Sequence, residues 1–138
     1  MGRLGLITAA VAAALAAGAA GAAGRAVTPD EFEAMVTGRT LHFDRHGAPY
    51  GAEQYFPDKR VIWAFEDGQC QRGIWFENAS GHICFVYEND PAPQCWLFLE
   101  MPDGAFHARV VGADPASDLV ASSIDEEPLD CPLPDLGV

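Results

Sequence analysis

Residues 60–101 read RVIWAFEDGQCQRGIWFENASGHICFVYENDPAPQCWLFLEM, and this stretch decides the fold. It contains all three tryptophans and three of the four cysteines of the chain. Its apolar and aromatic residues form short runs, separated by turn-forming sequences at 67–68, 78–81 and 89–93. Such runs between turn signals are typical of consecutive antiparallel strands. We therefore expect four strands, at about 59–66, 70–77, 82–88 and 94–101.

The flanking sequence fits the same architecture. Thr28, Pro29 and Glu31 form a capping box with proline at the first helical position, which predicts a short helix that ends at Gly38. Alternating patterns predict further strands at 40–43, 53–56 and 105–111. The expected fold class is mainly β: an antiparallel meander that forms a small barrel or a strongly curved sheet, with one short N-terminal helix.

The chain divides into three predicted regions. Residues 1–26 carry Arg3, then an apolar run, then small residues, which is the pattern of a secretory signal peptide. Cleavage fits after Ala22, Ala23 or Ala26, and we favour Ala26. Residues 27–112 form the β domain, and 113–138 are an acidic, proline-rich tail that we expect to be irregular and tethered by Cys131. The expected location is periplasmic or secreted, with no membrane insertion after signal cleavage.

The charge of the chain limits its partners. It has 20 acidic and 8 basic residues and a formal net charge of -12, and removal of Arg3 and Arg25 with the signal peptide makes the net charge more negative still. Nucleic acids and anionic membranes are poor partners for such a surface. Four cysteines in a small exported domain predict two disulfides.

A register for the strands follows from the turns. A two-residue turn at Asp67-Gly68 sets Phe65 opposite Cys70, and a turn centred on Ala79-Ser80 sets Trp75 opposite Cys84. One face of the sheet then carries the aromatic residues, and Trp75 lies on the other face, over the cysteines. If the sheet closes, the aromatic face lines a cavity, as in lipocalin-like binders. The candidate lining residues are Trp63, Phe65, Phe76, Phe85, Tyr87, Trp96 and Phe98.

The same register predicts the disulfides. Cys84 and Cys95 fall on one face of adjacent strands, close enough for a bridge. Cys70 lies on the opposite face, which leaves Cys70–Cys131 by elimination. Beyond Leu99 the register puts Phe106 and Val110 outside. Either a bulge at Pro102 reverses the faces there, or the N-terminal helix covers the second face.

Several short motifs resemble a group of small exported alphaproteobacterial proteins known mainly as a domain of unknown function. The motifs are Gly38-Arg39-Thr40-Leu41, Tyr55-Phe56, Gly73-Ile74-Trp75, Cys84-Phe85 and Cys95, and they span residues 38–99. The resemblance implies an exported β-rich domain and supports the Cys84–Cys95 bridge, but it brings no catalytic residues. The short segment between these cysteines and the Cys131 tail depart from the pattern of the group.

No catalytic, cofactor-binding or metal-binding residues are expected. His42 and His46 are the one close histidine pair, and they straddle a strand end and a loop. The carboxylates Asp44, Glu53, Asp58, Glu66, Glu77 and Glu88 come mostly beside predicted turns, where acids are solvated. We therefore expect an exported, non-enzymatic binding or interaction module for a small apolar ligand or a protein. The alternatives are an inhibitor or stress-protective barrel that binds through acidic loops, and a hydrolase on an unfamiliar scaffold.

Overall fold

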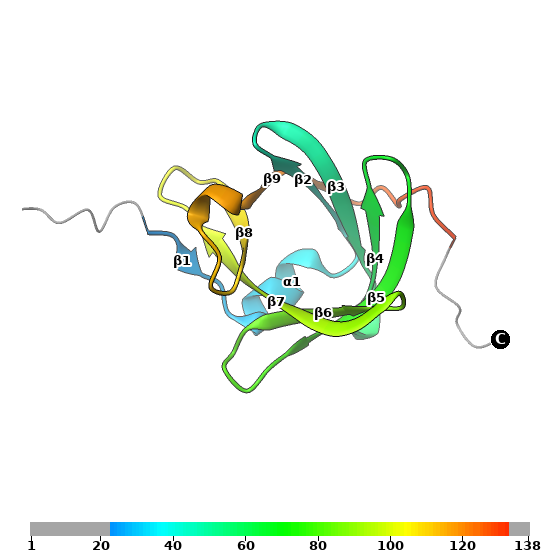
Figure 1. The fold of residues 1–138 in the computed structure, drawn as a ribbon, viewed down its shortest axis with the longest axis horizontal. Coiled ribbons are helices and arrows are strands. Elements are labelled where there is room, and N and C mark those ends of the chain that lie inside the picture. The colour runs from blue at the N-terminus through cyan, green and yellow to red at the C-terminus, as the bar shows by residue number, and fades with distance from the viewer. Residues whose placement is uncertain (1–22, 133–138) are drawn as a thin grey trace, which may run out of the picture.

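Eight antiparallel strands close into a barrel in the computed structural model, which describes residues 23–132 (Figure 1). Each strand pairs with the next one along the chain, and the last strand pairs back with the first. The barrel is therefore a meander closed by its two ends, which confirms the expected fold class and selects the closed form. The strands are β2 (Thr40–Arg45), β3 (Ala48–Tyr55), β4 (Arg60–Phe65), β5 (Cys70–Glu77), β6 (Ile83–Tyr87), β7 (Asp90–Glu100), β8 (Phe106–Val110) and β9 (Leu119–Asp125).

Short elements complete the structure. β1 (Arg25–Ala26) pairs with the end of β7, and two 3-10 turns cover Pro57–Lys59 and Pro115–Ser117. The helix α1 (Pro29–Val36) begins with the predicted capping box between Thr28 and Glu31. Phe32 and Val36 of α1 are fully buried, so this short helix is held by packing rather than by its own hydrogen bonds.

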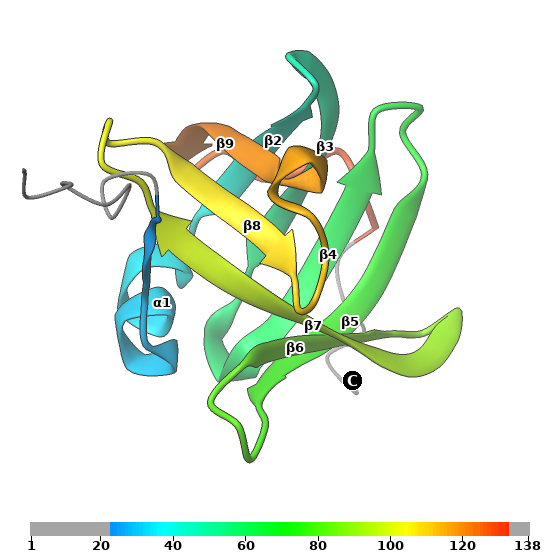
Figure 2. The ribbon, with the colours of Figure 1, turned by 60° about the vertical axis from the view of Figure 1, so that its left-hand side comes forward.

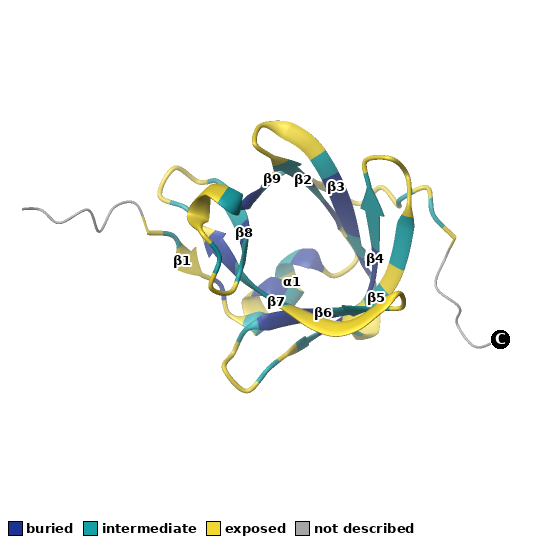
Figure 3. Ribbon diagram, in the orientation of Figure 1, coloured by how far each residue is buried: buried dark blue, intermediate teal, exposed yellow. Residues whose placement is uncertain are grey.

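The two ends of the barrel differ. α1 lies across one end, seen through the ring of strands in Figure 1. The antiparallel order puts the β3–β4, β5–β6 and β7–β8 connections at the α1 end and the other four at the opposite end. In Figure 3 the buried residues gather on α1 and the strand segments near it, whereas the β2–β3 and β6–β7 tips are exposed. We refer to the end away from α1 as the open end.

Three hairpins share a turn that the sequence analysis did not predict. At β4–β5, Gly68 N–H donates to the Phe65 carbonyl and Phe65 N–H donates to the Gln69 carbonyl, so the loop has three residues rather than two. The same pattern joins β7 to β8 around Gly104, and it recurs at β5–β6. Gly68 and Gly104 both have φ of 87°, the left-handed conformation that this loop requires at its last residue.

The extra loop residue shifts the register by one residue and exchanges the inward and outward faces of β5. Cys70 lies opposite Ala64, and Phe76 rather than Trp75 lies opposite Cys84. The predicted faces of β5 are therefore wrong: Trp75 is buried inside the barrel, whereas Phe76 is only half-buried and Ile74 is 50% exposed. A one-residue slip has this effect because side chains alternate between the two faces of a strand.

The same type of turn, between β7 and β8, determines which residues of β8 face the barrel interior. The loop 102–104 sets Glu100 opposite Phe106, so the faces follow the strand alternation and need no covering helix. Val110 lines the barrel interior and Phe106 packs against the core, opposite to the expected outward orientation. Figure 2 shows β8 lying between β7 and β9.

Part of the predicted tail belongs to the barrel. Residues 119–125, expected to be irregular, form β9, which pairs with β2 over most of its length and with β8 through two residue pairs. The predicted strand at 53–56 is also longer, since β3 begins at Ala48. Most of the predicted signal peptide, residues 1–22, lies outside the described residues.

Both predicted disulfides are present, Cys84–Cys95 and Cys70–Cys131. The first joins adjacent residues of β6 and β7, which are paired in the ladder. The second joins the start of β5 to the segment after β9, across a separation of 61 residues. Two disulfides in a small domain are typical of an oxidising environment outside the cytoplasm.

Candidate ligand cavity

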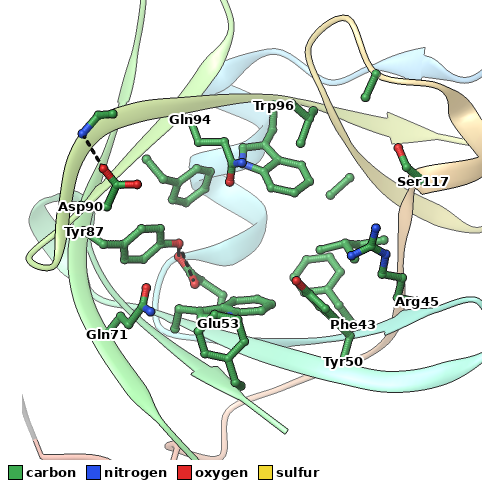
Figure 4. A pocket seen from close by; sticks show the side chains of 18 of the residues that line it. Phe43, Arg45, Tyr50, Glu53, Gln71, Tyr87, Asp90, Gln94, Trp96 and Ser117 are labelled. Atoms are coloured by element: carbon green, nitrogen blue, oxygen red, sulfur yellow. Dashed lines mark hydrogen bonds between the residues drawn. The ribbon is translucent and has the colours of Figure 1, made fainter.

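A cavity of about 630 Å3 occupies the barrel interior at the open end (Figure 4). An eight-stranded barrel is just wide enough to hold one small ligand, and the volume lies within the range of small-molecule sites. The lining is mostly aromatic, with a few polar groups. Its residues are Phe43, Arg45, Tyr50, Glu53, Tyr55, Trp63, Phe65, Gln71, Phe85, Tyr87, Asn89, Asp90, Ala92, Gln94, Trp96, Ala108, Val110, Ala113, Ser117 and Leu119.

Two inward-facing glycines make room for the largest rings. A Cβ atom at Gly51 would lie 2.4 Å from the Trp63 indole, and one at Gly73 would lie 2.8 Å from the Tyr87 ring. Both distances are shorter than any real contact of a Cβ atom, so the two rings lie against bare backbone. This leaves space in the centre of the barrel that side chains at 51 and 73 would otherwise fill.

The floor of the cavity is closed by aromatic packing above α1. The Phe32 ring lies 5.5 Å from that of Tyr55, 5.2 Å from that of Trp75 and 4.3 Å from that of Phe98, measured between centroids. The first two contacts are edge-to-face, an arrangement that stabilises aromatic pairs. Among the described residues, the helix therefore plugs one end of the barrel, and the interior opens at the other.

Glu53 is the buried acid of the site. Its side chain projects from β3 into the cavity, and the residue is 2% exposed. The Tyr87 hydroxyl lies 2.8 Å and 3.1 Å from the two carboxyl oxygens. Burial raises the pKa of Glu53 to about 8, although the hydrogen bond from Tyr87 opposes this shift. The carboxyl group is therefore mostly protonated at neutral pH.

No cationic side chain of residues 23–132 forms an ion pair with Glu53. The ion pairs of this region all involve other acids, namely Glu31, Glu33, Glu88, Glu100, Asp118 and Asp125. The pKa values of Tyr55 and Tyr87 are raised by their burial and by the adjacent negative charge of Glu53. Both tyrosines therefore stay neutral and can donate hydrogen bonds in the cavity.

Arg45 lies apart from Glu53, nearer the end of the neighbouring strand (Figure 4). It belongs to the end of β2, and its guanidinium lies 5.5 Å from the centroid of the Tyr50 ring. Tyr50 is the extra residue of a bulge, since Phe43 pairs with Gly51 and Asp44 with Pro49. The bulge lets Tyr50 line the cavity out of the normal alternation, and the pair borders the open end.

Five of the seven predicted cavity residues line the cavity. They are Trp63, Phe65, Phe85, Tyr87 and Trp96. Phe98 lies beneath, in the core next to Phe32. Phe76 is wrongly predicted, because the shifted register turns it to the outer face.

The polar residues of the site do not stand out in the sequence. Glu53 is one of the acids that come close to predicted turns. It is also two residues before Tyr55, and alternate residues of a strand share a face. An inward Tyr55 therefore implies an inward Glu53. Arg45, Gln71 and Gln94 carried no comparable signal, since their faces depend on the exact register.

The histidine pair does not form a site. His42 Nε2 lies 3.0 Å from Asp125 Oδ2, though not aligned for a hydrogen bond, and His46 lies in the β2–β3 turn. Within residues 23–132 no three His, Cys, Asp or Glu side chains are grouped as metal ligands would be. The same region contains no helix long and apolar enough to span a membrane.

Comparisons with protein-family models, with curated proteins and with solved structures found no significant match for this chain.

Proposed function

We propose that this chain is an exported, non-enzymatic protein that binds a small, largely apolar ligand inside its barrel. The observation that carries the proposal is the cavity of about 630 Å3, plugged by α1 at one end and open at the other. Binding sites of this kind are concave, mostly apolar and lined by a few placed polar groups. Glu53, Arg45 and Gln94 are such groups here.

The proposed location is the periplasm or the medium. The signal-peptide pattern of residues 1–26 and the two disulfides both support export. The interior favours a ligand over the other two hypotheses. An inhibitor that acts through rigid loops needs no internal cavity. Hydrolysis usually needs convergent acids and bases, and the lining offers two carboxylates, Glu53 and Asp90, and no histidine.

A pair of matched variants tests the site. Val110→Trp places an indole in the cavity near the open end, whereas Val111→Trp adds the same group at the next position, which is exposed. Native mass spectrometry of protein purified from the exported fraction should show a retained small molecule in the wild type and in Val111→Trp. It should be lost in Val110→Trp if that variant keeps the wild-type circular dichroism spectrum. An apo mass for the wild type, together with no thermal shift across a panel of apolar metabolites, would refute the proposal.

A further inference from the structure

The position of Glu53 bears on the chemistry of the ligand. A carboxyl group that is 2% exposed is costly to bury, and a purely apolar ligand would gain nothing from it. A glutamine would fill the same space and could still bond to Tyr87. The carboxyl faces the cavity and has only the Tyr87 hydroxyl as a partner among the described residues. Among the described residues, no cationic group therefore forms an ion pair with this carboxyl group.

The surroundings of Glu53 suit a cation. The rings of Trp63, Phe85 and Tyr87 line the same cavity, and the faces of aromatic rings attract ammonium groups. Arg45 is the one basic residue of the lining, and its guanidinium lies over the Tyr50 ring and forms no ion pair with Glu53. The formal net charge of -12 attracts cations towards the molecule and repels anions.

We propose that the ligand is an organic cation, a protonated amine on an aromatic or other apolar body, with its ammonium group against Glu53 and its body between the aromatic rings. This inference rests on the proposed function, since it requires a ligand in the cavity. It goes further by assigning the charge of that ligand and the residue that recognises it.

Proton linkage gives a signature of this arrangement. In the free protein Glu53 is mostly protonated at pH 7, because its pKa is raised to about 8. A bound ammonium group favours the ionised carboxylate, so binding releases close to one proton per ligand at pH 7. The other titratable groups that line the cavity are Arg45, Tyr50, Tyr55, Tyr87 and Asp90. Loss of the proton release in Glu53→Gln would assign it to Glu53 rather than to one of these groups.

The experiment compares probes that share an aromatic body and carry a positive, a neutral or a negative end group. Isothermal titration calorimetry is run with 2-phenylethylammonium, 2-phenylethanol and 3-phenylpropanoate, and with the naphthyl analogues of each, to allow for the size of the cavity. Titration at pH 7 in phosphate and in Tris gives the number of protons released. The proteins are the wild type, Glu53→Gln, and Glu77→Gln as a matched control, since Glu77 is exposed at the α1 end of β5.

We expect the wild type and Glu77→Gln to bind the amine at least about tenfold more tightly than the alcohol, with proton release. Glu53→Gln should bind both about equally and release no protons, with its affinity for the alcohol changed by less than about threefold. If the wild type binds the alcohol or the carboxylate as tightly as it binds the amine, the inference is overturned and the proposed function stands. The same holds for an amine preference that persists in Glu53→Gln. If no probe of any charge binds, the proposed function and the inference fail together.

Discussion

The Tyr87 hydroxyl bridges both oxygens of the Glu53 carboxyl group, at 2.8 Å and 3.1 Å, across the interior from β6 to β3. β6 and β3 are not neighbours in the sheet, because β4 and β5 lie between them. The contact therefore spans the hollow of the barrel instead of following its wall. It joins a neutral donor to an acid that has no cation beside it in the described part of the chain.

Replacement of Glu53 by glutamine should flatten the pH dependence of stability. The pKa of Glu53 is raised from 4.5 to about 8 in the folded protein, so the folded state holds a proton that the unfolded state loses. Stability therefore falls as pH rises between about 4.5 and 8, by up to about 1.4 kcal/mol per pH unit from this group. Urea unfolding at pH 5, 6, 7 and 8 should show this slope in the wild type and a weaker slope in Glu53→Gln. Parallel curves for the two proteins would show that Glu53 is ionised throughout this range.

Removal of the Tyr87 hydroxyl should raise the pKa of Glu53 further. The hydrogen bond from Tyr87 lowers that pKa, because it stabilises the carboxylate. In Tyr87→Phe the carboxyl group keeps its burial and loses this donor. Titration of the Glu53 carboxyl carbon by NMR should show a higher midpoint than in the wild type, and stability at pH 5 should fall by about 1 kcal/mol. A midpoint near 4.5 in the variant would mean that water reaches the carboxyl group.

The sequence predicted the elements of this site better than their orientation. The strands of residues 60–101 and the capping box at Thr28 follow from local patterns, and the presence of two disulfides follows from the cysteine count. The inward and outward faces of β5 do not follow from a local pattern. A loop of two residues and a loop of three at Gly68 are both compatible with the same Asp-Gly sequence. That single ambiguity exchanged Trp75 and Phe76 between the core and the outer face.

The closing strand β9 was not predicted, for a different reason. β9 lies in a segment rich in acids and prolines, whose composition is typical of irregular structure. Its partner in the ladder is β2, about 80 residues earlier in the chain. Long-range pairing of this kind leaves little trace in a local pattern, and it overrides local composition once Leu119 is buried against the core.

The β8–β9 corner should depend on Asp118. These strands share two residue pairs, so their seam is short, and Asp118, the residue before β9, adds contacts to β8. Its carboxylate accepts hydrogen bonds from Arg109 Nε and Nη2, both at 2.7 Å, and lies 3.0 Å from His107 Nδ1. Burial alone would raise the pKa of Asp118, but the contacts with Arg109 and His107 outweigh it and hold the pKa below the ordinary value.

We expect Asp118→Asn to lower the free energy of unfolding by about 2–3 kcal/mol at pH 7. Because the folded pKa of Asp118 is depressed, its contribution is present above pH 4 and disappears as pH falls through the folded pKa. The difference between variant and wild type should therefore shrink in acid. Asp103→Asn is the control, since Asp103 is an exposed turn residue that accepts one backbone hydrogen bond and asparagine can replace it. Equal effects of the two substitutions at pH 7 would contradict the special role of Asp118.

Loss of the Cys70–Cys131 bridge should weaken the fold without changing the cavity. The bridge closes a loop of about 60 residues, which by chain entropy corresponds to about 4 kcal/mol at most. Neither cysteine lines the cavity. The double variant Cys70→Ala/Cys131→Ala should therefore unfold at lower denaturant concentration while it binds the amine probe as the wild type does. A tenfold loss of affinity at a temperature where the variant is fully folded would show that the bridge shapes the site.

The contacts of Arg25 predict where the mature chain begins if the protein is exported as proposed. Arg25 makes two hydrogen bonds to Glu31 and two to Glu100, and residues 25–26 pair with β7. The hydrogen bonds from Arg25, with one from the Thr28 backbone, lower the pKa of Glu31 to about 2. Cleavage after Ala26, the position that the sequence favoured, would remove β1 and leave Glu31 and Glu100 without Arg25. We therefore expect cleavage after Ala22 or Ala23, and an intact mass that corresponds to a chain beginning at Ala23 or Gly24.

Arg25→Ala should lower the Tm more than Arg39→Ala, which alters an exposed arginine. The difference should shrink at high salt because exposed ion pairs are screened. An exported protein that begins at Val27 and has the same Tm as one beginning at Gly24 would contradict a structural role for this segment.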